Sequence, residues 1–390
     1  MTAKFFPYGK QFVDENDIQA VISVLKSSNL TQGPAIEIFE LNFAKYVGAD
    51  YAVTFNSATS ALHCINIAHG IGANDICVVP ANTFVATANA YEYVGAKVHI
   101  IDIDAETRNI DLDSLEELLF STKIESLTCV HYAGTPVDME RVYNLSQKYG
   151  FKVVEDACHA VGGLEKNGGK IGCAKYSDAC VFSFHPVKGL TAGEGGMVTT
   201  NNFELYKKLL RLRSHGINKS FAELIRKSND LWYYEQQELG YNYRMTDISA
   251  ALGNSQLQKL PRFISKRREL AKNYDYLFAN NKLVSPVCEN YRDLSGLHLY
   301  VIDIEFNNLR INKSDFMKQL REQNIGTQVH YIPLYRHPYF MSKYGNDQKF
   351  FKNSEIHYMN ALSIPLYYEL ELNEQEYIAT NINEMILKYV

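Results

Sequence analysis

The chain has 390 residues, of which 46% are hydrophobic and 21% charged, and this composition excludes a mainly disordered protein. The formal net charge of −5 gives no general attraction to nucleic acids, and no apolar run is long enough to cross a membrane or to act as a signal peptide. Seven cysteines without a C-x-x-C pair favour neither a disulfide framework nor a zinc ribbon, so we expect no metal site and a cytoplasmic location.

Short apolar strands alternate with helices through the first half of the chain. A helix is predicted around 18–25, and the segment 30–34 (L-T-Q-G-P) ends it. Strands are then predicted at 51–55, 76–79, 98–103, 127–132, 153–156 and 179–183. The intervening helices are predicted at 59–69, 83–93, 112–119 and 139–149. This alternation indicates an α/β fold with a mostly parallel sheet, whose ligands bind beyond the carboxyl ends of the strands.

The alternation weakens after about residue 247. Helical patterns occupy 248–260 and 262–278, a strand is predicted at 300–304, and another helix at 313–323. We therefore expect a large domain over residues 1–249 and a smaller α+β domain over residues 250–390.

Lys188 lies in the most informative segment, S-F-H-P-V-K-G-L-T-A-G-E-G-G, directly after the last predicted strand. Most lysines are solvated surface charges. Here the apolar neighbours disfavour the ammonium form and so lower the pKa, which produces a nucleophilic amine. The glycines that follow allow the backbone to approach a ligand closely.

Asp156 ends the predicted strand at 153–156. A carboxylate in this position is either the N-cap of the next helix or the partner of a protonated ring nitrogen. An aspartate that pairs with a pyridinium nitrogen, together with a Schiff-base lysine, is typical of pyridoxal 5′-phosphate (PLP) enzymes. With Lys188, this residue indicates PLP chemistry.

Two further strand ends carry candidate ligand contacts. The segment N-S-A-T-S-A from Asn56 opens a helix, whose first amides attract phosphate; a simple capping motif is the alternative. In P-A-N-T-F, Phe84 is either a stacking surface for a flat ring or a core residue.

With these motifs and several others in the same order, the chain resembles the DegT/DnrJ/EryC1/StrS family of PLP-dependent aminotransferases over nearly its full length. The other motifs are L-T-Q-G, H-Y-A-G-T-P-V-D-M, E-D-A-C-H-A, L-R-S-H-G-I, G-Y-N-Y-R-M-T-D and Q-V-H-Y-I-P-L-Y. The resemblance implies fold type I, with a mostly parallel seven-stranded sheet in the large domain. It also implies a homodimer whose active sites lie at the subunit interface.

The resemblance assigns roles by position. Lys188 matches the Schiff-base lysine that also shuttles the proton. The remaining cofactor contacts that it implies are Ala58, Thr59, Phe84, Asp156, His159, Ser183 and, donated to the partner subunit, Asn242. The substrate contacts that it implies are Tyr8, Leu30, Thr31, His330 and Tyr331.

His159 departs from the family pattern, because many relatives have glutamine there. A histidine can still hydrogen-bond the ring hydroxyl of the cofactor. This residue and the forms of two motifs are most similar to the family branch that aminates C4 of a UDP-linked 4-keto sugar in pseudaminic acid biosynthesis. L-Glutamate and UDP-2-acetamido-2,6-dideoxy-β-L-arabino-hex-4-ulose are then the expected substrates.

Several alternatives remain open at this stage. The substrate of a C4 aminotransferase could instead be another UDP-, dTDP- or GDP-4-keto-6-deoxy sugar, of the bacillosamine/legionaminic, perosamine or viosamine type. A non-catalytic PLP-binding regulatory relative is a second alternative. A sugar dehydratase of the same family would carry histidine at the position of Lys188, and a purely structural protein would not need polar motifs at successive strand ends.

Overall fold

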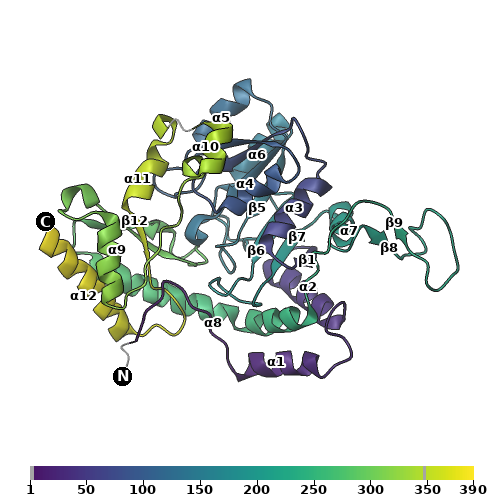
Figure 1. Ribbon diagram of the computed structural model, residues 1–390, viewed down its shortest axis with the longest axis horizontal. Coiled ribbons are helices and arrows are strands. Elements are labelled where there is room, and N and C mark those ends of the chain that lie inside the picture. The colour runs from purple at the N-terminus through teal and green to yellow at the C-terminus, as the bar shows by residue number, and fades with distance from the viewer. Residues whose placement is uncertain (1–3, 346–347) are drawn as a thin grey trace.

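A seven-stranded sheet forms the centre of the computed structural model, which describes residues 4–345 and 348–390 (Figure 1). Its strands are β1 (Tyr51–Phe55), β2 (Ile76–Pro80), β3 (Lys97–Ile101), β4 (Ser126–Val130), β5 (Lys152–Asp156), β6 (Ala179–Ser183) and β7 (Gly196–Thr200). Their order is β1-β7-β6-β5-β4-β2-β3, and β7 runs antiparallel to both of its neighbours while the other adjacent pairs are parallel. The predicted α/β fold with a mostly parallel sheet is confirmed.

Helices cover both faces of this sheet, as parallel strands require. They include α2 (Pro34–Val47), α3 (Ala58–Ala68), α4 (Val85–Glu92), α5 (Leu112–Ser121), α6 (Met139–Tyr149) and α7 (Phe203–Leu212). Helix α1 (Glu15–Leu25) packs instead against the long helix α8 (Asp247–Phe278) (Figure 1). The sequence prediction lacked α2, α7 and β7. Helix α2 begins at Pro34 itself, because proline at the first helical position gives up an amide that has no partner there anyway.

The C-terminal part packs around a second, three-stranded antiparallel sheet in the order β10-β11-β12. Its elements are α8 (Asp247–Phe278), β10 (Val284–Pro286), β11 (Tyr300–Ile304), α9 (Lys313–Glu322), α10 (Pro338–Tyr344), α11 (Lys352–Asn360), β12 (Ala361–Ile364) and α12 (Leu372–Tyr389). Phe6 joins the hydrophobic core of this part, so the N-terminal segment crosses over to it.

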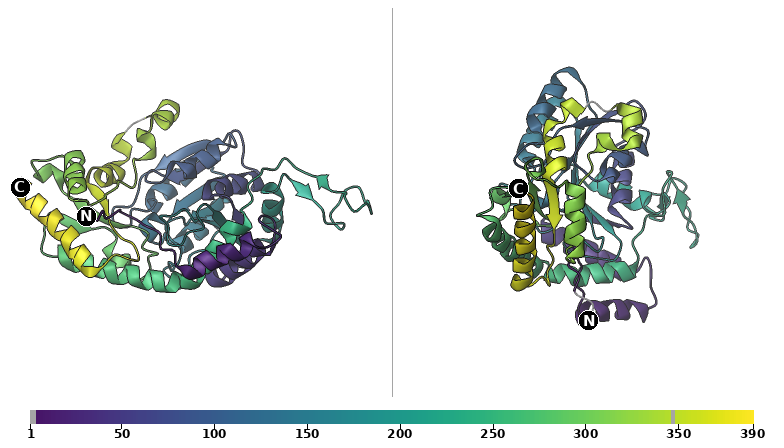
Figure 2. Two further views of the ribbon diagram at one scale, coloured as in Figure 1. Left: turned by 60° about the horizontal axis from the view of Figure 1, so that its bottom comes forward. Right: turned by 60° about the vertical axis from the view of Figure 1, so that its left-hand side comes forward.

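Helix α8 connects the two parts and corrects one expectation. The two predicted helical segments around Pro261 form one continuous, curved helix of 32 residues (Figure 2). Pro261 removes one backbone hydrogen bond from the helix, because proline has no N–H group. The packing of the helix before and after Pro261 outweighs that loss. Leu257 and Ile264 belong to the core of the large sheet, whereas Leu270 and Tyr274 belong to the core of the small one. Both cores thus share α8, which contains the predicted domain boundary at residues 249 and 250.

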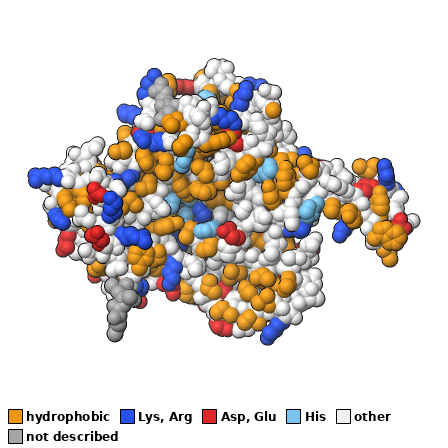
Figure 3. Space-filling model, viewed as in Figure 1, with side chains coloured by type: hydrophobic (Ala, Val, Ile, Leu, Met, Phe, Trp, Pro, Cys, Tyr) orange, Lys and Arg blue, Asp and Glu red, His pale blue; other side chains and the backbone are white. Residues whose placement is uncertain are grey.

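A narrow arm projects from the molecule between α7 and α8 (Figures 1 and 2). It contains a short antiparallel hairpin of β8 (Ile217–Asn218) and β9 (Glu235–Gln236). Large hydrophobic side chains are exposed along it, and hydrophobic atoms gather at its tip in Figure 3. They are Phe221, Ile225, Leu231, Trp232, Tyr234 and Leu239.

Candidate active site

A cavity of about 620 Å³ opens at the carboxyl ends of the central strands. Residues that follow β1, β2, β5 and β6 line one side, and residues 328–332 with His298 line the other. Figure 3 shows hydrophobic and histidine side chains around a hollow near the centre of this face. The cavity therefore lies where the sheet topology predicts the ligand, between the two parts of the chain.

One end of the cavity is formed by the first turn of α3. Ser57 is the N-cap, and its hydroxyl accepts a hydrogen bond from the amide of Ser60 at 3.2 Å. The amides of Ala58 and Thr59 begin the helix and have no partner within it. Gly196 lies directly behind, and a Cβ atom there would come within 2.6 Å of the Ala58 nitrogen. This end presents free N–H groups and the positive end of a helix dipole, which suits a phosphate.

Asp156 lies at the base of the cavity and is 6% exposed. Its Oδ2 atom accepts a hydrogen bond from the Thr87 hydroxyl at 2.8 Å, and its Oδ1 atom accepts one from the Cys158 amide at 3.2 Å. These bonds fix the orientation of the carboxylate. A cationic ring nitrogen would find its partner here.

Lys188 is the lysine that lines the cavity, and it is partly buried. Burial lowers the pKa of this amine from its ordinary value, while Cys158 and Asp156 oppose the shift. Its Nζ atom lies 3.5 Å from Nε2 of His298. The lowered pKa increases the neutral fraction of the amine, which is the form that attacks a carbonyl carbon.

Both ring nitrogens of His159 have partners within the chain. Nδ1 accepts a hydrogen bond from the Ala133 amide at 3.3 Å, and Nε2 lies 2.7 Å from the Tyr331 hydroxyl. Burial holds the pKa of His159 well below its usual range, so the ring is neutral. These two contacts place the proton on Nε2, which donates to Tyr331. The Nε2 proton of His159 is therefore bonded to the Tyr331 hydroxyl. Sequence analysis expects this histidine to bond the ring hydroxyl of the cofactor instead.

Aromatic and histidine side chains complete the walls. The rings of Phe84 and Tyr331 lie 5.9 Å apart, and those of Tyr8 and His330 lie 5.2 Å apart. Phe84 is 56% exposed, so it offers a ring face to a ligand rather than to the core. Burial lowers the pKa of His330 to about 3, and Ser363 hydrogen-bonds its Nδ1 atom at 2.8 Å.

The cavity brings together ten of the thirteen residues expected to act in the site. They are Tyr8, Ala58, Thr59, Phe84, Asp156, His159, Ser183, Lys188, His330 and Tyr331. Leu30, Thr31 and Asn242 do not line it. Thr31 forms an isolated bridge with Thr246, and Asn242 forms one with Ser214 at the base of the arm. The roles of these three residues stay predictions.

Sequence analysis missed several residues of the lining, above all His298. It lies just before β11, in the segment S-G-L-H-L-Y. The only signal in the sequence is that a histidine immediately precedes an apolar strand. Cys158 and Glu194 lie within motifs used above but also line the cavity. No local pattern reveals that His298 reaches Lys188, because 110 residues separate them in sequence.

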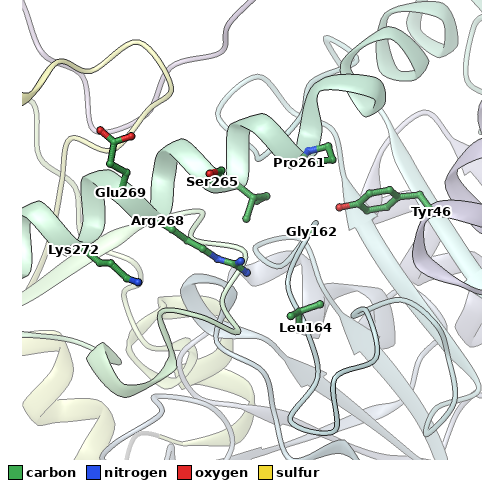
Figure 4. Close-up of a pocket in the computed structure, with 9 residues that line it drawn as sticks. Tyr46, Gly162, Leu164, Pro261, Ser265, Arg268, Glu269 and Lys272 are labelled. Carbon is green, nitrogen blue, oxygen red and sulfur yellow. The ribbon is translucent and has the colours of Figure 1, made fainter.

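A second pocket lies beside Pro261 of α8, away from the strand ends (Figure 4). Arg268 extends from the helix towards the loop at Gly162, and Tyr46 lies on the opposite wall. It lacks a nucleophile paired with a carboxylate. In residues 4–345 and 348–390 we find neither a cluster of side chains suited to a metal ion nor a helix long and apolar enough to span a membrane.

Comparisons with known proteins agree with this geometry. Residues 11–383 match the DegT/DnrJ/EryC1/StrS aminotransferase family, which confirms the resemblance drawn from the motifs. The UDP-4-amino-4,6-dideoxy-N-acetyl-β-L-altrosamine transaminase of Campylobacter jejuni is 38% identical, over 98% of this chain and 97% of the relative.

Two solved structures show the same fold over their full length. Helicobacter pylori PseC, an aminotransferase involved in the biosynthesis of pseudoaminic acid, has a TM-score of 0.90 and 32% identity, covering 99% of this chain and 100% of that one. The PLP form of the sugar aminotransferase Spr1654 from Streptococcus pneumoniae, described as putative, has a TM-score of 0.88 and 27% identity, covering 99% of each chain.

Proposed function

Because the chain belongs to the DegT/DnrJ/EryC1/StrS aminotransferase family, we propose that it transfers the amino group of L-glutamate to C4 of a nucleotide-linked 4-keto-6-deoxy sugar. The observation that carries this proposal is the meeting of Lys188, Asp156 and the amino end of α3 in one cavity. An amine of lowered pKa, a fixed carboxylate and a phosphate-binding helix end are the three features that PLP chemistry needs.

The residues of the cavity fit PLP as the cofactor. Gly196 lets the first turn of α3 lie against β7, which leaves its amides free for the phosphate. Asp156 is buried and oriented for the ring nitrogen, and Phe84 exposes a ring face beside it. When bound, PLP supplies an electron-accepting ring that stabilises the charge left when a proton leaves the carbon next to the amino group.

The chain's own residues then provide binding and proton transfer. Lys188 would hold PLP covalently at rest, and its Nζ atom, once freed by the amino substrate, would accept the proton from the substrate carbon and return it in the second half of the transfer. Asp156 would hold the ring nitrogen as its ionic partner. Tyr8, His330 and Tyr331 lie on the side of the cavity formed by the N-terminal segment and the small domain, where we place the sugar.

For the acceptor we propose UDP-2-acetamido-2,6-dideoxy-β-L-arabino-hex-4-ulose, the 4-keto sugar of pseudaminic acid biosynthesis. The similarity to the C. jejuni transaminase and to H. pylori PseC supports this choice over other nucleotide-linked sugars. The His159–Tyr331 pair supports it as well, since it joins His159 to the Q-V-H-Y-I-P-L-Y motif, and both features suggested this branch.

We propose that the working unit is a homodimer. Among the residues that line the cavity, Lys188 is the sole lysine or arginine, and its amine is committed to the cofactor. A nucleotide diphosphate therefore needs cations from elsewhere. The projecting arm carries Lys219, Arg226 and Lys227 together with its exposed hydrophobic side chains, and a second copy of the chain would bury both.

We also propose a cytoplasmic location. The seven cysteines are free, and burial raises the pKa of each thiol, so they are inert thiols rather than halves of disulfide bonds.

The direct test is to incubate the purified protein with L-glutamate and a panel of UDP-, dTDP- and GDP-4-keto-6-deoxy sugars. Mass spectrometry and NMR of the product identify the aminated carbon and its configuration. We expect amination at C4 of the UDP-N-acetyl sugar, with one 2-oxoglutarate formed per amino sugar. Amination of a dTDP or GDP sugar alone would replace the proposed substrate, and no amination of any would contradict the aminotransferase proposal.

A further inference from the structure

His298 contacts the amine of Lys188, although no motif points to it. Its side chain is 4% exposed and lines the same cavity as the lysine. Nε2 lies 3.5 Å from Lys188 Nζ, and the ring lies 4.5 Å from that of His159. The residue comes two positions before β11, so the small domain carries it to the lysine of the large one.

The position of His298 is fixed by the backbone around it. Arg267 of α8 is 3% exposed, and its Nη1 atom donates hydrogen bonds to the carbonyls of Leu297, His298 and Leu366 at 3.1, 3.3 and 3.1 Å. The Ser295 hydroxyl accepts a further bond from the Leu297 amide at 2.9 Å. A guanidinium that holds three carbonyls makes this turn rigid, and a rigid support is what a positioning side chain requires.

The environment of His298 keeps its imidazole neutral. Burial lowers its pKa well below the usual range, and the positive charges of Lys188 and Arg267 and the nearby rings of His159 and His330 act in the same direction. A neutral imidazole has one nitrogen that accepts a hydrogen bond. Lys188 has only N–H groups to donate when it is protonated, so Nε2 is the acceptor in this pair.

Nδ1 of His298 then carries the proton, and it has no partner among residues 4–345 and 348–390. Buried polar atoms without partners are rare in folded proteins, and those that occur gather at functional sites. His69 and His357 also bury an Nδ1 atom without a partner, but neither lines the cavity, so His298 is distinguished by the contact of its other nitrogen with Lys188.

We propose that His298 is a positioning residue for Lys188, accepting a hydrogen bond at Nε2 from the lysine amine while that amine carries the transferred proton. No proton passes to the imidazole, because its neutral form is favoured; the proton stays on Nζ and His298 fixes the point from which it is delivered. This inference rests on the proposed function, since it assigns a task within the reaction of Lys188.

Two variants of His298 and a matched control separate this role from simple packing. Leucine at position 298 keeps the bulk and removes the acceptor, whereas glutamine places an amide oxygen near the position of Nε2. His69 is the control: it also has a buried Nδ1 without a partner, at the C-terminal end of α3, but it does not line the cavity. The set is therefore His298→Leu, His298→Gln and His69→Gln.

The first readout does not depend on catalysis. The rate at which the visible band forms when PLP is added to apoenzyme reports the neutral fraction of Lys188, and its pH profile gives the pKa of the amine. Losing a hydrogen bond to the ammonium form lowers that pKa, and we expect a shift of about one unit in His298→Leu. His298→Gln and His69→Gln should retain the wild-type profile within a few tenths of a unit.

The second readout is the single-turnover rate with L-glutamate. We expect His298→Leu to lower this rate by about tenfold to a hundredfold with little change in the glutamate concentration needed for half-saturation, and His298→Gln to recover most of it. An unchanged pH profile in a folded His298→Leu protein would overturn the proposal, as would equal losses in the leucine and glutamine variants. If wild-type enzyme did not react with glutamate, the proposed function would fail, yet the pH profiles would still test the contact.

Discussion

At the scale of single residues, the site depends on two side chains whose chemistry follows from their surroundings. Lys188 follows β6 and Asp156 ends β5, which are neighbouring parallel strands, so the fold alone places them at the same edge. Both were predictable from sequence, because strand ends can be recognised locally. The pairing of Lys188 with His298 and of His159 with Tyr331 was not, since each joins residues more than 100 positions apart.

Replacing Lys188 by alanine tests the covalent anchor. The variant should lack the visible absorption band of the PLP-bound protein and should lose turnover by at least about a thousandfold, because one amine serves as anchor and as acid and base. Lys313→Met is the matched control: burial lowers the pKa of this lysine to about 8, but it lies outside the cavity. Rapid transamination by Lys188→Ala, or equal loss in the control, would refute the assignment.

At the scale of elements, strands and their helices were predicted to within a few residues where the pattern is regular. Helix α6, for example, has the predicted bounds, because its apolar positions recur at helical spacing behind the Asp138 cap. Pattern reasoning was wrong about α8, because Pro261 indicates a break when only its local effect is considered. The burial of Leu257 and Leu270 in two different cores decides this helix, and burial in a distant core is not visible in local sequence.

Gly196 at the start of β7 provides a prediction about an element contact. A methyl group there would lie 2.5 Å from the carbonyl carbon of Ser57, so Gly196→Ala must displace the amino end of α3. We expect the dissociation constant for PLP to rise at least about tenfold, since each misplaced phosphate contact costs a sizeable fraction of a hydrogen bond to a charged group. Titration of apoenzyme with PLP measures the effect.

Gly72→Ala serves as its control, because the nearest atom to a Cβ at that position lies 4.0 Å away. This variant should bind PLP as the wild type does. Unaltered binding in Gly196→Ala would show that the first turn of α3 does not hold the phosphate.

At the scale of the whole molecule, two features exceed what one folded chain explains. The arm exposes Leu231 and Trp232 to solvent, and the cavity lacks cations for a diphosphate. The proposed homodimer would account for both if the arm of each copy covered the cavity of the other. The length and charge of the sequence could not predict the exposed hydrophobic surface of the arm. In sequence, its hydrophobic residues resemble those of a core segment, and only the fold shows that they are exposed.

The arm predicts the behaviour of a double variant, Leu231→Ser with Trp232→Ser. Removing two large exposed anchors should weaken self-association, so light scattering at micromolar concentration should show more monomer than for the wild type. Binding of the nucleotide sugar should weaken as well, whereas the folding of the monomer should be unaffected because both side chains are outside every core cluster of the described residues. A double variant that is dimeric and fully active would contradict this assembly.

The buried histidines predict an acid-sensitive fold. Burial lowers the pKa of His330 and His357 to about 3, below the unfolded value of about 6.5, so the unfolded chain binds more protons between these limits. The free energy of unfolding should therefore fall as the pH drops from 6.5, by up to about 1.4 kcal/mol per unit for each histidine. The lowered pKa of carboxylates such as Glu92 and Glu355 matters only below about 4.5.

Urea unfolding at pH 7, 6 and 5 measures this slope, and His357→Gln removes one contributor. The variant should be less stable at pH 7 but should lose less stability on acidification. A free energy of unfolding that stays constant from pH 7 to pH 5 would show that these imidazoles take up protons over this range in the folded protein as they do in the unfolded chain.

The visible spectrum of the PLP-bound protein before and after addition of L-glutamate tests the central claim most directly. We predict that the band of the lysine-bound cofactor disappears and that one 2-oxoglutarate forms per chain, as the amino group moves to the cofactor. A protein that binds PLP at Lys188 but keeps its spectrum unchanged in glutamate, with no 2-oxoglutarate formed, would contradict the account.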